Sequence, residues 1–420
     1  MILYYMKHAW RMLWQDKFFT IISLLGIGLA VSFIMVILTV NEIDDASISP
    51  ESNRYRTLYV KSLRESHGEH FNNNSFISER LMNNVFYTLK NVEAVTGIMT
   101  SSSVVEPTLF SGEGKNVSIK GVDGSYWKFF DFEFVAGKPF TSSDFKSGIR
   151  VAVIDDQLAK TLYKGESCLG KDVYIAQQPF KIVGVVKSVD PSATFAYSRV
   201  WTPYTTDANI IASKDTYACG PISALILAKS PSDFDAIKAE LAQNLKRYNQ
   251  PVLKETQIHL HGPDTHSEQR FRKWASDEES RYNEMMKLWI TVIVVLMFVP
   301  ALNMTSFTIS RMKKRQEELG LRRSFGAFKS NIVAQVVAEN MVLTLIGGVI
   351  GLVFSIVLML AFKSALYPDG LSFSLTTFFR PTILGYLIAT CVVINLLSAL
   401  FPAIYSARQP IVQALKSKKS

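Results

Sequence analysis

The chain has 420 residues, of which 48% are hydrophobic and 19% charged, so it is more apolar than an average soluble protein. The apolar residues concentrate at the N-terminus and in the last third, whereas residues 41–285 have the composition of a soluble domain. The net charge of +9 would favour nucleic-acid binding if it formed a stripe on a soluble fold. Much of it instead lies beside the apolar runs, where basic residues fix membrane topology. The composition therefore argues against a nucleic-acid partner and favours a membrane protein with a large soluble part.

Long apolar runs predict four membrane-spanning helices, because a bilayer core about 30 Å thick needs roughly 20 apolar residues. The first run, 18–40, carries no charge, and residues 41–50 lack a convincing cleavage site, so we expect an uncleaved signal anchor. The basic and tryptophan residues before it predict an amphipathic segment in the headgroup layer. The expected organisation is an N-terminal segment 1–17, spans 18–40, 288–309, 332–362 and 382–406, a core domain 41–263, a stalk helix 264–287, loops 310–331 and 363–381, and a tail 407–420.

The distribution of basic residues predicts the orientation. The connection between the second and third spans holds seven of them, whereas the connection between the third and fourth holds only Lys363 and Arg380. The seven are Arg311, Lys313, Lys314, Arg315, Arg322, Arg323 and Lys329. Positive-inside counting therefore places both termini and the 310–331 loop in the cytoplasm, with the core domain and the 363–381 loop outside.

The outer segment mixes strand-like and helix-like patterns, which predicts an α+β domain of two subdomains. Strands are expected within 54–63, 116–123, 150–156, 172–175, 179–189 and 224–229, and helices over 78–92, 157–163 and 230–248. Ser230 or Ser232 is expected to cap the last of these helices. Aromatic residues at helical spacing in 264–289 predict a stalk helix continuous with the second span; an amphipathic helix packed on its own domain is an equal alternative.

No motif in the chain predicts catalysis, a metal site or a cofactor. GESCLGKD (165–172) approaches a phosphate-binding loop, but Asp172 replaces the hydroxyl that binds Mg²⁺, and a helix-like segment precedes the loop where a strand is needed. His259, His261 and His266 lie near Asp264, yet a solvated loop is favoured over a metal site because nothing fixes a fourth ligand. Cys168 and Cys219 could form a disulfide in an oxidising compartment, but the sequence does not decide whether they do.

The loop after the second span combines basic, acidic, apolar and glycine residues in an unusual way. Two glutamates and two glycines interrupt the basic run, and apolar residues lie between them. If the positive charges served only to keep the loop in the cytoplasm, the glutamates and glycines among them would have no explanation. A docking element for a cytoplasmic partner accounts for them. The expected docking residues are Glu317, Glu318, Leu319, Gly320, Leu321, Arg322, Arg323, Phe325 and Gly326.

The same loop carries a resemblance to a known family. EELGLRRSFGA (317–327) resembles the E-x-G-L-R-R-A-x-G-A signature of MacB/FtsX-type ABC transporter permeases, the type VII group, with Ser324 in place of alanine. Gln335, Glu339 and Asn340 resemble the Q-x3-E-[SN] that follows, and PAIYSARQPIVQALK (402–416) is similar to the family's C-terminal pattern. Three segments of the outer domain resemble the outer domain of MacB: 121–140, 150–163 and 169–186.

The resemblance implies a multi-pass inner-membrane protein with a helical membrane domain of four spans and a MacB-like periplasmic core, and a permease that is not itself an enzyme. It implies a separate cytoplasmic ABC ATPase that docks on residues 317–327, a second permease copy or paralogue, and a periplasmic adaptor or cargo. ATP hydrolysis would then move the periplasmic domain through the stalk, and so drive export or extraction of peptides, antibiotics, toxins or lipoproteins. Gly347 and Gly351 have the small-x3-small spacing of close helix packing and are a candidate dimer face.

Two other functions are compatible with the same sequence. An FtsX-like chain would regulate a periplasmic cell-wall hydrolase, although the outer domain is longer than the FtsX loop. A receptor without ATPase coupling would tolerate charge reversal in the 317–327 loop.

Overall fold

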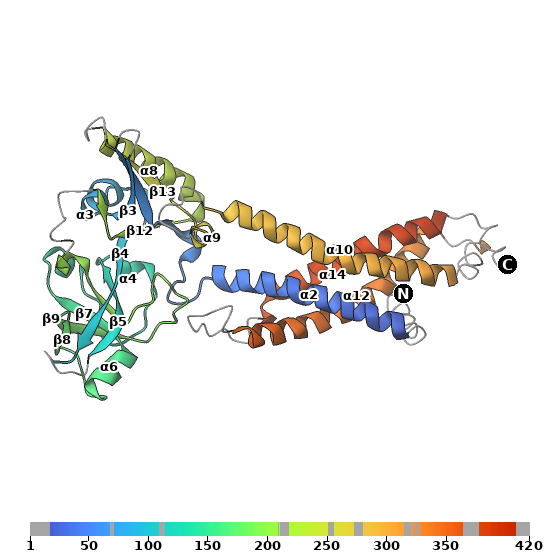
Figure 1. Ribbon diagram of the computed structural model, residues 1–420, viewed down its shortest axis with the longest axis horizontal. Helices are drawn as coiled ribbons and strands as arrows, with labels where there is room; N and C mark the ends of the chain where they lie inside the picture. Colours follow the sequence, from blue (N-terminus) through green and yellow to red (C-terminus); the bar gives the residue numbers. More distant parts are fainter. Residues whose placement is uncertain are drawn as a thin grey trace. The chain divides into compact units, whose positions relative to one another are not determined.

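The computed structural model resolves the chain into two compact units, residues 45–285 and residues 1–44 with 286–420 (Figure 1). Each is described by itself. The structure describes residues 17–67, 71–108, 114–208, 210, 218–250, 256–272, 280–314, 321, 324–325, 328–363 and 378–408.

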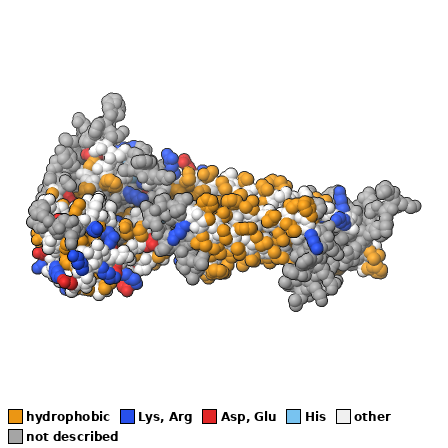
Figure 2. Space-filling model, turned by 60° about the horizontal axis from the view of Figure 1, so that its bottom comes forward, with side chains coloured by type: hydrophobic (Ala, Val, Ile, Leu, Met, Phe, Trp, Pro, Cys, Tyr) orange, Lys and Arg blue, Asp and Glu red, His pale blue; other side chains and the backbone are white. Residues whose placement is uncertain are grey.

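The second unit consists of long apolar helices. Four of them, each at least 19 residues long over the described part, are apolar enough to cross a membrane, which confirms the four expected spans. Figure 2 shows hydrophobic side chains gathered over their surface, as a lipid-facing surface requires. Pro300 lies inside the second of them without ending it. The helices are α2 (Lys17–Asp45), α10 (Tyr282–Lys314), α12 (Lys329–Ala361) and α14 (Pro381–Arg408).

The outer unit contains a mixed sheet of nine strands in the order β1-β12-β4-β5-β10-β7-β9-β6, with β8 paired to β4 and β9. The pairs β5–β10 and β7–β9 are parallel, and the other pairs are antiparallel. The strands are β1 (Thr57–Val60), β4 (Ala94–Glu106), β5 (Lys115–Val122), β6 (Phe134–Gly137), β7 (Val151–Asp155), β8 (Asp172–Ile175), β9 (Gln178–Val186), β10 (Val200–Pro203) and β12 (Ser223–Leu227).

A second, smaller sheet has the order β11-β3-β2-β13. The two sheets and the helices around them confirm the expected α+β class. The strands of the smaller sheet are β2 (Ser62–His67), β3 (Phe71–Ile77), β11 (Cys219–Gly220) and β13 (Thr256–His261). The α-helices of the outer unit are α3 (Glu79–Leu81), α4 (Tyr126–Phe129), α5 (Ser142–Lys146), α6 (Asp156–Tyr163), α8 (Phe234–Asn249) and α9 (His266–Arg270). A π-helix, η2 (Met82–Phe86), follows α3, and three 3₁₀ turns are η1 (Arg54–Arg56), η3 (Tyr204–Thr206) and η4 (Pro231–Asp233).

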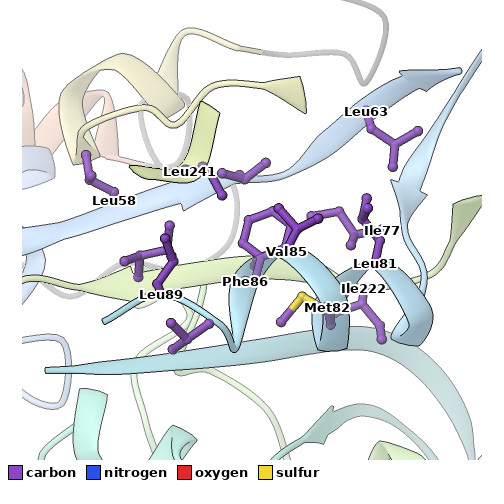
Figure 3. Packing of buried hydrophobic residues seen from close by; sticks show 14 of the residues in the cluster. Leu58, Leu63, Ile77, Leu81, Met82, Val85, Phe86, Leu89, Ile222 and Leu241 are labelled. Atoms are coloured by element: carbon purple, nitrogen blue, oxygen red, sulfur yellow. The ribbon is translucent and has the colours of Figure 1, made fainter. Parts of the chain in front are cut away.

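The apolar core explains why helical segments cover these sheets. Leu81, Val85 and Phe86 fall on one face of α3 and η2 and are fully buried against strand residues of both sheets (Figure 3). Helix α8 contributes Leu241 and Ile237 to the same cluster. A capping box at Ser230, one of the two expected caps, begins the η4–α8 segment.

A buried carboxylate joins several elements of the outer unit. Asp123 is 3% exposed, and its Oδ1 accepts hydrogen bonds from the hydroxyl of Thr96 at 2.8 Å and from the backbone N–H groups of Ser125 and Tyr126 at 2.9 and 3.0 Å. Its Oδ2 accepts from the Tyr87 hydroxyl at 2.5 Å and from the N–H of residue 97 at 3.0 Å. Burial raises the pKa of Asp123, and the hydrogen bonds from Tyr87 and residue 97 oppose this rise. The single side chain thus ties β4, the segment after η2 and the start of α4 together.

The expected stalk helix over 264–287 is divided in the structure. Residues 266–270 form the separate short helix α9, Phe271 is a turn residue and Arg272 has no helical structure. Helix α10 begins at Tyr282. Arg272 pairs with Asp264 on the other side of α9, at 2.6 Å between Nε and Oδ2. The expected helix over 78–92 likewise ends at Phe86.

Candidate functional site

The expected docking loop lies between α10, which ends at Lys314, and α12, which begins at Lys329. Most of its predicted residues lie outside the described part of the chain: Glu317, Glu318, Leu319, Gly320, Arg322, Arg323 and Gly326. Leu321 and Phe325 are described, and they are 53% and 84% exposed. Phe328, the residue directly before α12, is 75% exposed.

These exposed apolar side chains need a partner surface. Leu321, Phe325 and Phe328 fall within eight residues, in a segment that also carries the basic residues of the loop. Clustered exposed apolar side chains rimmed by charge mark protein or membrane contact sites, and aromatic anchors dominate the binding energy of protein interfaces. The segment therefore has the chemistry of a docking element, and lipid is the other surface that could cover it.

A buried polar cluster lies where the two helices flank this loop. Its members are Thr308 and Arg311 on α10 and Gln335, Glu339 and Asn340 on α12, all at most 9% exposed. The amide of Asn340 donates to the Thr308 hydroxyl at 2.8 Å, and the amide of Gln335 donates to Oε1 of Glu339 at 2.8 Å. The Arg311 guanidinium lies 4.1 Å from the centre of the Phe307 ring, as in a cation–π contact. The hydrogen bond from Asn340 to Thr308 joins α12 to α10 at the two ends of the loop, whereas the other two contacts each lie within one helix.

Helix α14 is joined to both of these helices by hydrogen bonds. The amide of Asn395 donates to the carbonyl of Val337 on α12 at 3.2 Å. The hydroxyl of Thr305 on α10 donates to the carbonyl of Ser398 on α14 at 3.2 Å. Asn395 and Ser398 are fully buried. The three helices are therefore linked pairwise, so that each is held by the other two.

The glycine pair on α12 packs against α2 of the same chain. A Cβ atom at Gly347 would lie 2.7 Å from Cγ2 of Ile27, and one at Gly351 would lie 2.7 Å from Cβ of Val31 and 2.9 Å from the carbonyl oxygen of Gly28. Only glycine allows so close an approach, as expected of small-x3-small helix packing. The face that carries Gly347 and Gly351 is thus occupied by α2 within one chain.

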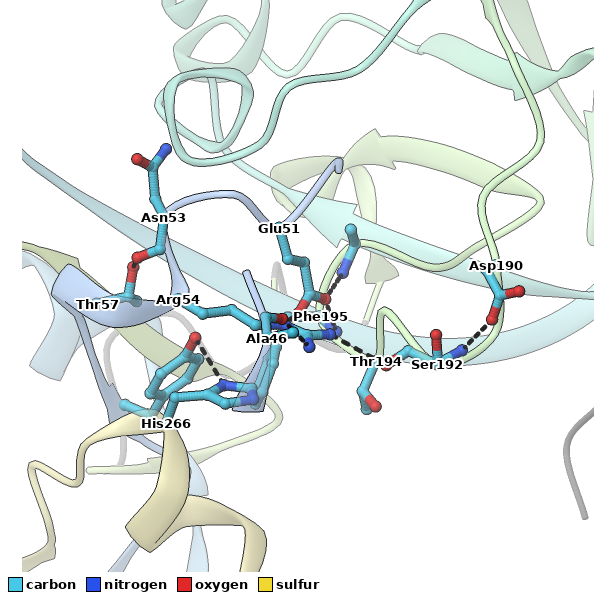
Figure 4. Close-up of polar contacts among 12 residues, drawn as sticks. Ala46, Glu51, Asn53, Arg54, Thr57, Asp190, Ser192, Thr194, Phe195 and His266 are labelled. Atoms are coloured by element: carbon cyan, nitrogen blue, oxygen red, sulfur yellow. Dashed lines mark hydrogen bonds and ion pairs between the residues drawn. The ribbon is translucent and has the colours of Figure 1, made fainter. Parts of the chain in front are cut away.

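The start of the outer unit is anchored directly after α2 (Figure 4). Glu51 is 2% exposed; its Oε2 pairs with Nε of Arg54 at 2.7 Å, and its Oε1 accepts from the N–H groups of Phe195 and Ala196 at 2.8 and 2.9 Å. The same guanidinium donates from Nη1 to the carbonyl of Ala46, one residue beyond α2, at 2.9 Å. The chain is therefore fixed to the outer unit immediately where α2 ends.

The other connection is anchored through α9. The Arg270 guanidinium donates to Asp45, the last residue of α2, at 2.8 Å. The Lys61 ammonium donates to the carbonyl of Gln269 at 2.9 Å, and the Ser280 hydroxyl donates to the carbonyl of Glu268 at 2.5 Å. Burial lowers the pKa of Lys61 to about 8, with the nearby Asp264 carboxylate opposing the shift. Helix α9 thus touches the end of α2, the residue after β1, and Ser280, which precedes α10.

Two of the histidines near Asp264 pack as buried side chains. Within the described ranges, no group of three His, Cys, Asp or Glu side chains is placed to hold a metal ion. His261 contacts the Ser62 hydroxyl at 3.2 Å through Nδ1, and His266 contacts the Tyr59 hydroxyl at 3.3 Å through Nδ1, so both pack as buried polar groups.

The three cysteines and the 165–172 segment can be compared with their expectations. Cys168, Cys219 and Cys391 are free thiols, so the pairing left open for the first two does not form. Burial, together with the Glu65 carboxylate that accepts from its thiol, raises the pKa of Cys219 to about 12. The 165–172 segment follows α6 and precedes β8, which is the reverse of the order that a phosphate-binding loop needs.

Sequence reasoning missed the link between the three helices. Asn340 was noted through the family pattern, but nothing indicated that it lies beside Thr308 of the preceding span. Asn395 and Ser398 sit inside an apolar run whose periodicity is weak, so the face they occupy was not predictable. The available signal was the presence of amide side chains at membrane depth, since such groups are costly there without a hydrogen-bond partner.

Comparison with known proteins places the chain among bacterial permeases. The family model of the MacB-like periplasmic core domain matches residues 20–244, and that of the FtsX-like permease C-terminal region matches residues 290–411. The ABC transporter permease YknZ of Bacillus subtilis is 24% identical over 342 residues, which cover 80% of this chain and 81% of YknZ. The macrolide export ATP-binding/permease protein MacB of Pasteurella multocida is 21% identical over 416 residues, 98% of this chain and 60% of MacB.

One further relative and two solved structures are also similar to the chain. The pyoverdine export ATP-binding/permease protein PvdT of Pseudomonas syringae is 22% identical over 98% of this chain and 59% of its own length. The chain therefore spans about three fifths of the length of these ATP-binding/permease relatives. The periplasmic region of MacB from Actinobacillus actinomycetemcomitans aligns with a TM-score of 0.32 and 17% identity, covering 48% of this chain and 88% of that region. The extracellular domain of YknZ aligns with a TM-score of 0.33 and 19% identity, covering 47% of this chain and all of that domain.

Proposed function

Because this chain belongs to the MacB/FtsX family of ABC transporter permeases, whose core-domain model covers residues 20–244, we propose that it couples ATP hydrolysis by a cytoplasmic ABC ATPase to motion of its extracytoplasmic domain. The permease does not hydrolyse ATP itself. The ATPase is a separate subunit and docks on the loop at 317–327, and both chain termini lie on the same, cytoplasmic side. A second permease copy or paralogue completes the complex in the membrane.

The exposed apolar side chains of the loop are the observation that carries this proposal. Phe325 is 84% exposed and Leu321 is 53% exposed, in a loop rich in basic residues between two helices whose roots are fixed to each other. A partner that binds this loop can move α10 and α12 together. The basic residues keep the loop on the cytoplasmic side, where ATP is available.

Motion at the outer face would drive export or extraction of a cargo. The relatives whose alignments cover 98% of this chain are named for macrolide export and pyoverdine export, which favours export over the regulation of a cell-wall hydrolase. We propose a peptide, antibiotic, toxin or lipoprotein as the class of cargo, with a periplasmic adaptor as a further partner.

The test is the recovery of partners from native membranes. The chain, tagged at its C-terminus and purified after mild cross-linking, is expected to bring down an ABC ATPase, and deletion of its gene should change drug sensitivity or export. Recovery of a cell-wall hydrolase together with a defect in cell separation would support the FtsX-like role instead. Recovery of no ATPase would contradict the proposed coupling.

A further inference from the structure

The four membrane helices are held together in two different ways. Helices α10, α12 and α14 are joined pairwise by hydrogen bonds: Asn340 to Thr308, Asn395 to the carbonyl of Val337, and Thr305 to the carbonyl of Ser398. In hydrocarbon no water can replace a broken hydrogen bond, so separating any two of these helices leaves buried polar groups without partners. These three helices, which we call the hydrogen-bonded trio, resist relative motion.

Over most of its length, helix α2 packs on this trio through van der Waals contacts, without side-chain hydrogen bonds. Over the described residues 20–40, no side chain of α2 is hydrogen-bonded to another helix; Ser32 donates to the carbonyl of Leu29 within α2, and the buried hydroxyls of Thr20 and Thr39 have no partner. Beyond this stretch, the Thr382 hydroxyl of α14 donates to Glu42 at 3.0 Å, in an exposed position. The contact consists instead of Ile27 and Val31 against the glycines of α12.

We infer that the hydrogen-bonded trio moves as one body with the docking loop, and that α2 is the helix against which it moves. The loop joins two members of the trio directly, at Lys314 and Lys329, so a force on the loop acts on the trio. We call the contact of Ile27 and Val31 on α2 with Gly347 and Gly351 on α12 the seam. These apolar surfaces can shift by small steps without breaking a hydrogen bond between them. The inference rests on the proposed function, and it assigns to the seam the role of the moving joint.

The connections of the outer domain make such a shift consequential. The chain enters the outer domain from α2 and leaves it into α10, a member of the trio. The entry is fixed by Arg54 to Ala46 and by Arg270 to Asp45, and the exit by Ser280 to the carbonyl of Glu268. A displacement of α2 relative to α10 therefore acts on two anchored points of one domain.

Disulfide locks across the seam test the inference. A Cβ atom at Gly351 would lie 2.7 Å from Cβ of Val31, and the two Cβ atoms of a disulfide are about 3.8 Å apart, so a small shift suffices to bridge them. The variant V31C/G351C, made with Cys391→Ala, is co-purified with the ATPase recovered from native membranes and reconstituted in nanodiscs. Oxidation is expected to lower its ATP hydrolysis about tenfold, since conformational steps limit such cycles. Reduction is expected to restore it, and the amount of bound ATPase should not change.

The matched control is a lock within the trio. A Cβ atom at Gly348 on α12 would lie 2.5 Å from the native thiol of Cys391 on α14. The single substitution Gly348→Cys therefore allows a disulfide between α12 and α14. This lock is expected to leave ATP hydrolysis unchanged. In both variants the reduced protein reports any damage from the substitutions themselves, and peptide mass spectrometry confirms that the bond forms. If V31C/G351C misfolds, I27C/G347C bridges the same seam, where the Cβ atoms would lie 2.9 Å apart.

Each outcome decides one claim. Unchanged hydrolysis in the oxidised seam lock would overturn the role of the seam as the joint. Loss of hydrolysis in the oxidised Gly348→Cys protein would overturn the rigidity of the trio. A wild-type preparation that binds no ATPase would instead count against the proposed function, before any lock is tested.

Discussion

Replacing Leu321 and Phe325 together by aspartate is expected to abolish recovery of the ABC ATPase with this chain. Both side chains are exposed and apolar, and burying each against a partner contributes about 1.5–3 kcal/mol. A carboxylate in their place adds the cost of an unpaired charge in a desolvated interface. A combined loss of about 4 kcal/mol weakens binding by roughly a thousandfold, which is enough to remove the partner during purification. Quantitative mass spectrometry of the purified complex measures the ratio of ATPase to permease.

The control for this variant is the same chemical change at an unrelated exposed apolar residue. Val135 on the edge strand β6 of the outer domain is 61% exposed, and Val135→Asp is expected to leave the ratio unchanged. The conservative change Phe325→Leu should retain most of the binding. Equal recovery of the ATPase with the double aspartate variant and with wild type would exclude these side chains from the docking surface.

Replacing Asp123 by alanine is expected to destabilise the outer domain by about 4 kcal/mol or more, because each buried donor left without an acceptor costs about 1–3 kcal/mol. Five donors are affected: the hydroxyls of Thr96 and Tyr87 and the N–H groups of residues 97, 125 and 126. Hydrogen exchange of β4 and β5 in the purified chain, followed by mass spectrometry, measures the loss of protection around this residue.

Asp144→Ala serves as the control for the Asp123 variant. Asp144 also accepts hydrogen bonds, from the backbone and hydroxyl of Thr141 in a capping box, but in an exposed position. Loss of such a cap costs about 1 kcal/mol and acts locally on α5. Indistinguishable exchange of β4 in the two variants would mean that Asp123 does not hold these elements together.

Asp123 gives a structural reason for the resemblance of residues 121–140 to the outer domain of MacB. The segment that begins with Gly121 was noted only for its resemblance to MacB. Its aspartate proves to be the acceptor on which β4, α4 and Tyr87 converge, and its aromatic residues pack in the core, where the Trp201 indole donates to the Tyr126 hydroxyl at 3.2 Å. A resemblance can thus be converted into a statement about hydrogen bonds only when the strands that meet at the residue are known.

Local patterns predicted many of the elements. Alternation found β5, β7, β8, β9 and β12, and charge-free length found all four membrane helices. Strand β4 was missed although it is 13 residues long, because its middle reads as serine, threonine and glycine, which are typical of loops. The break before α10 was missed because the aromatic residues of 264–289 keep helical spacing on both sides of it.

The candidate site was predictable only in part. Composition singled out the loop, since two glutamates and two glycines in a basic run are unusual, and exposure of Leu321 and Phe325 agrees with a docking role. The hydrogen-bonded trio depends on which faces of three helices meet. That information lies in packing between residues such as Thr305 and Ser398, 93 positions apart, and not in any local spacing.

Photocross-linking from position 325 in living cells tests the central claim most directly. With benzoylphenylalanine in place of Phe325, irradiation is expected to join the chain to an ABC ATPase, and the product should be identified by mass spectrometry of the cross-linked band. The same probe at Val135 should give no such product. A cross-link from position 325 to lipid or to a periplasmic protein, with no ATPase adduct, would contradict the account.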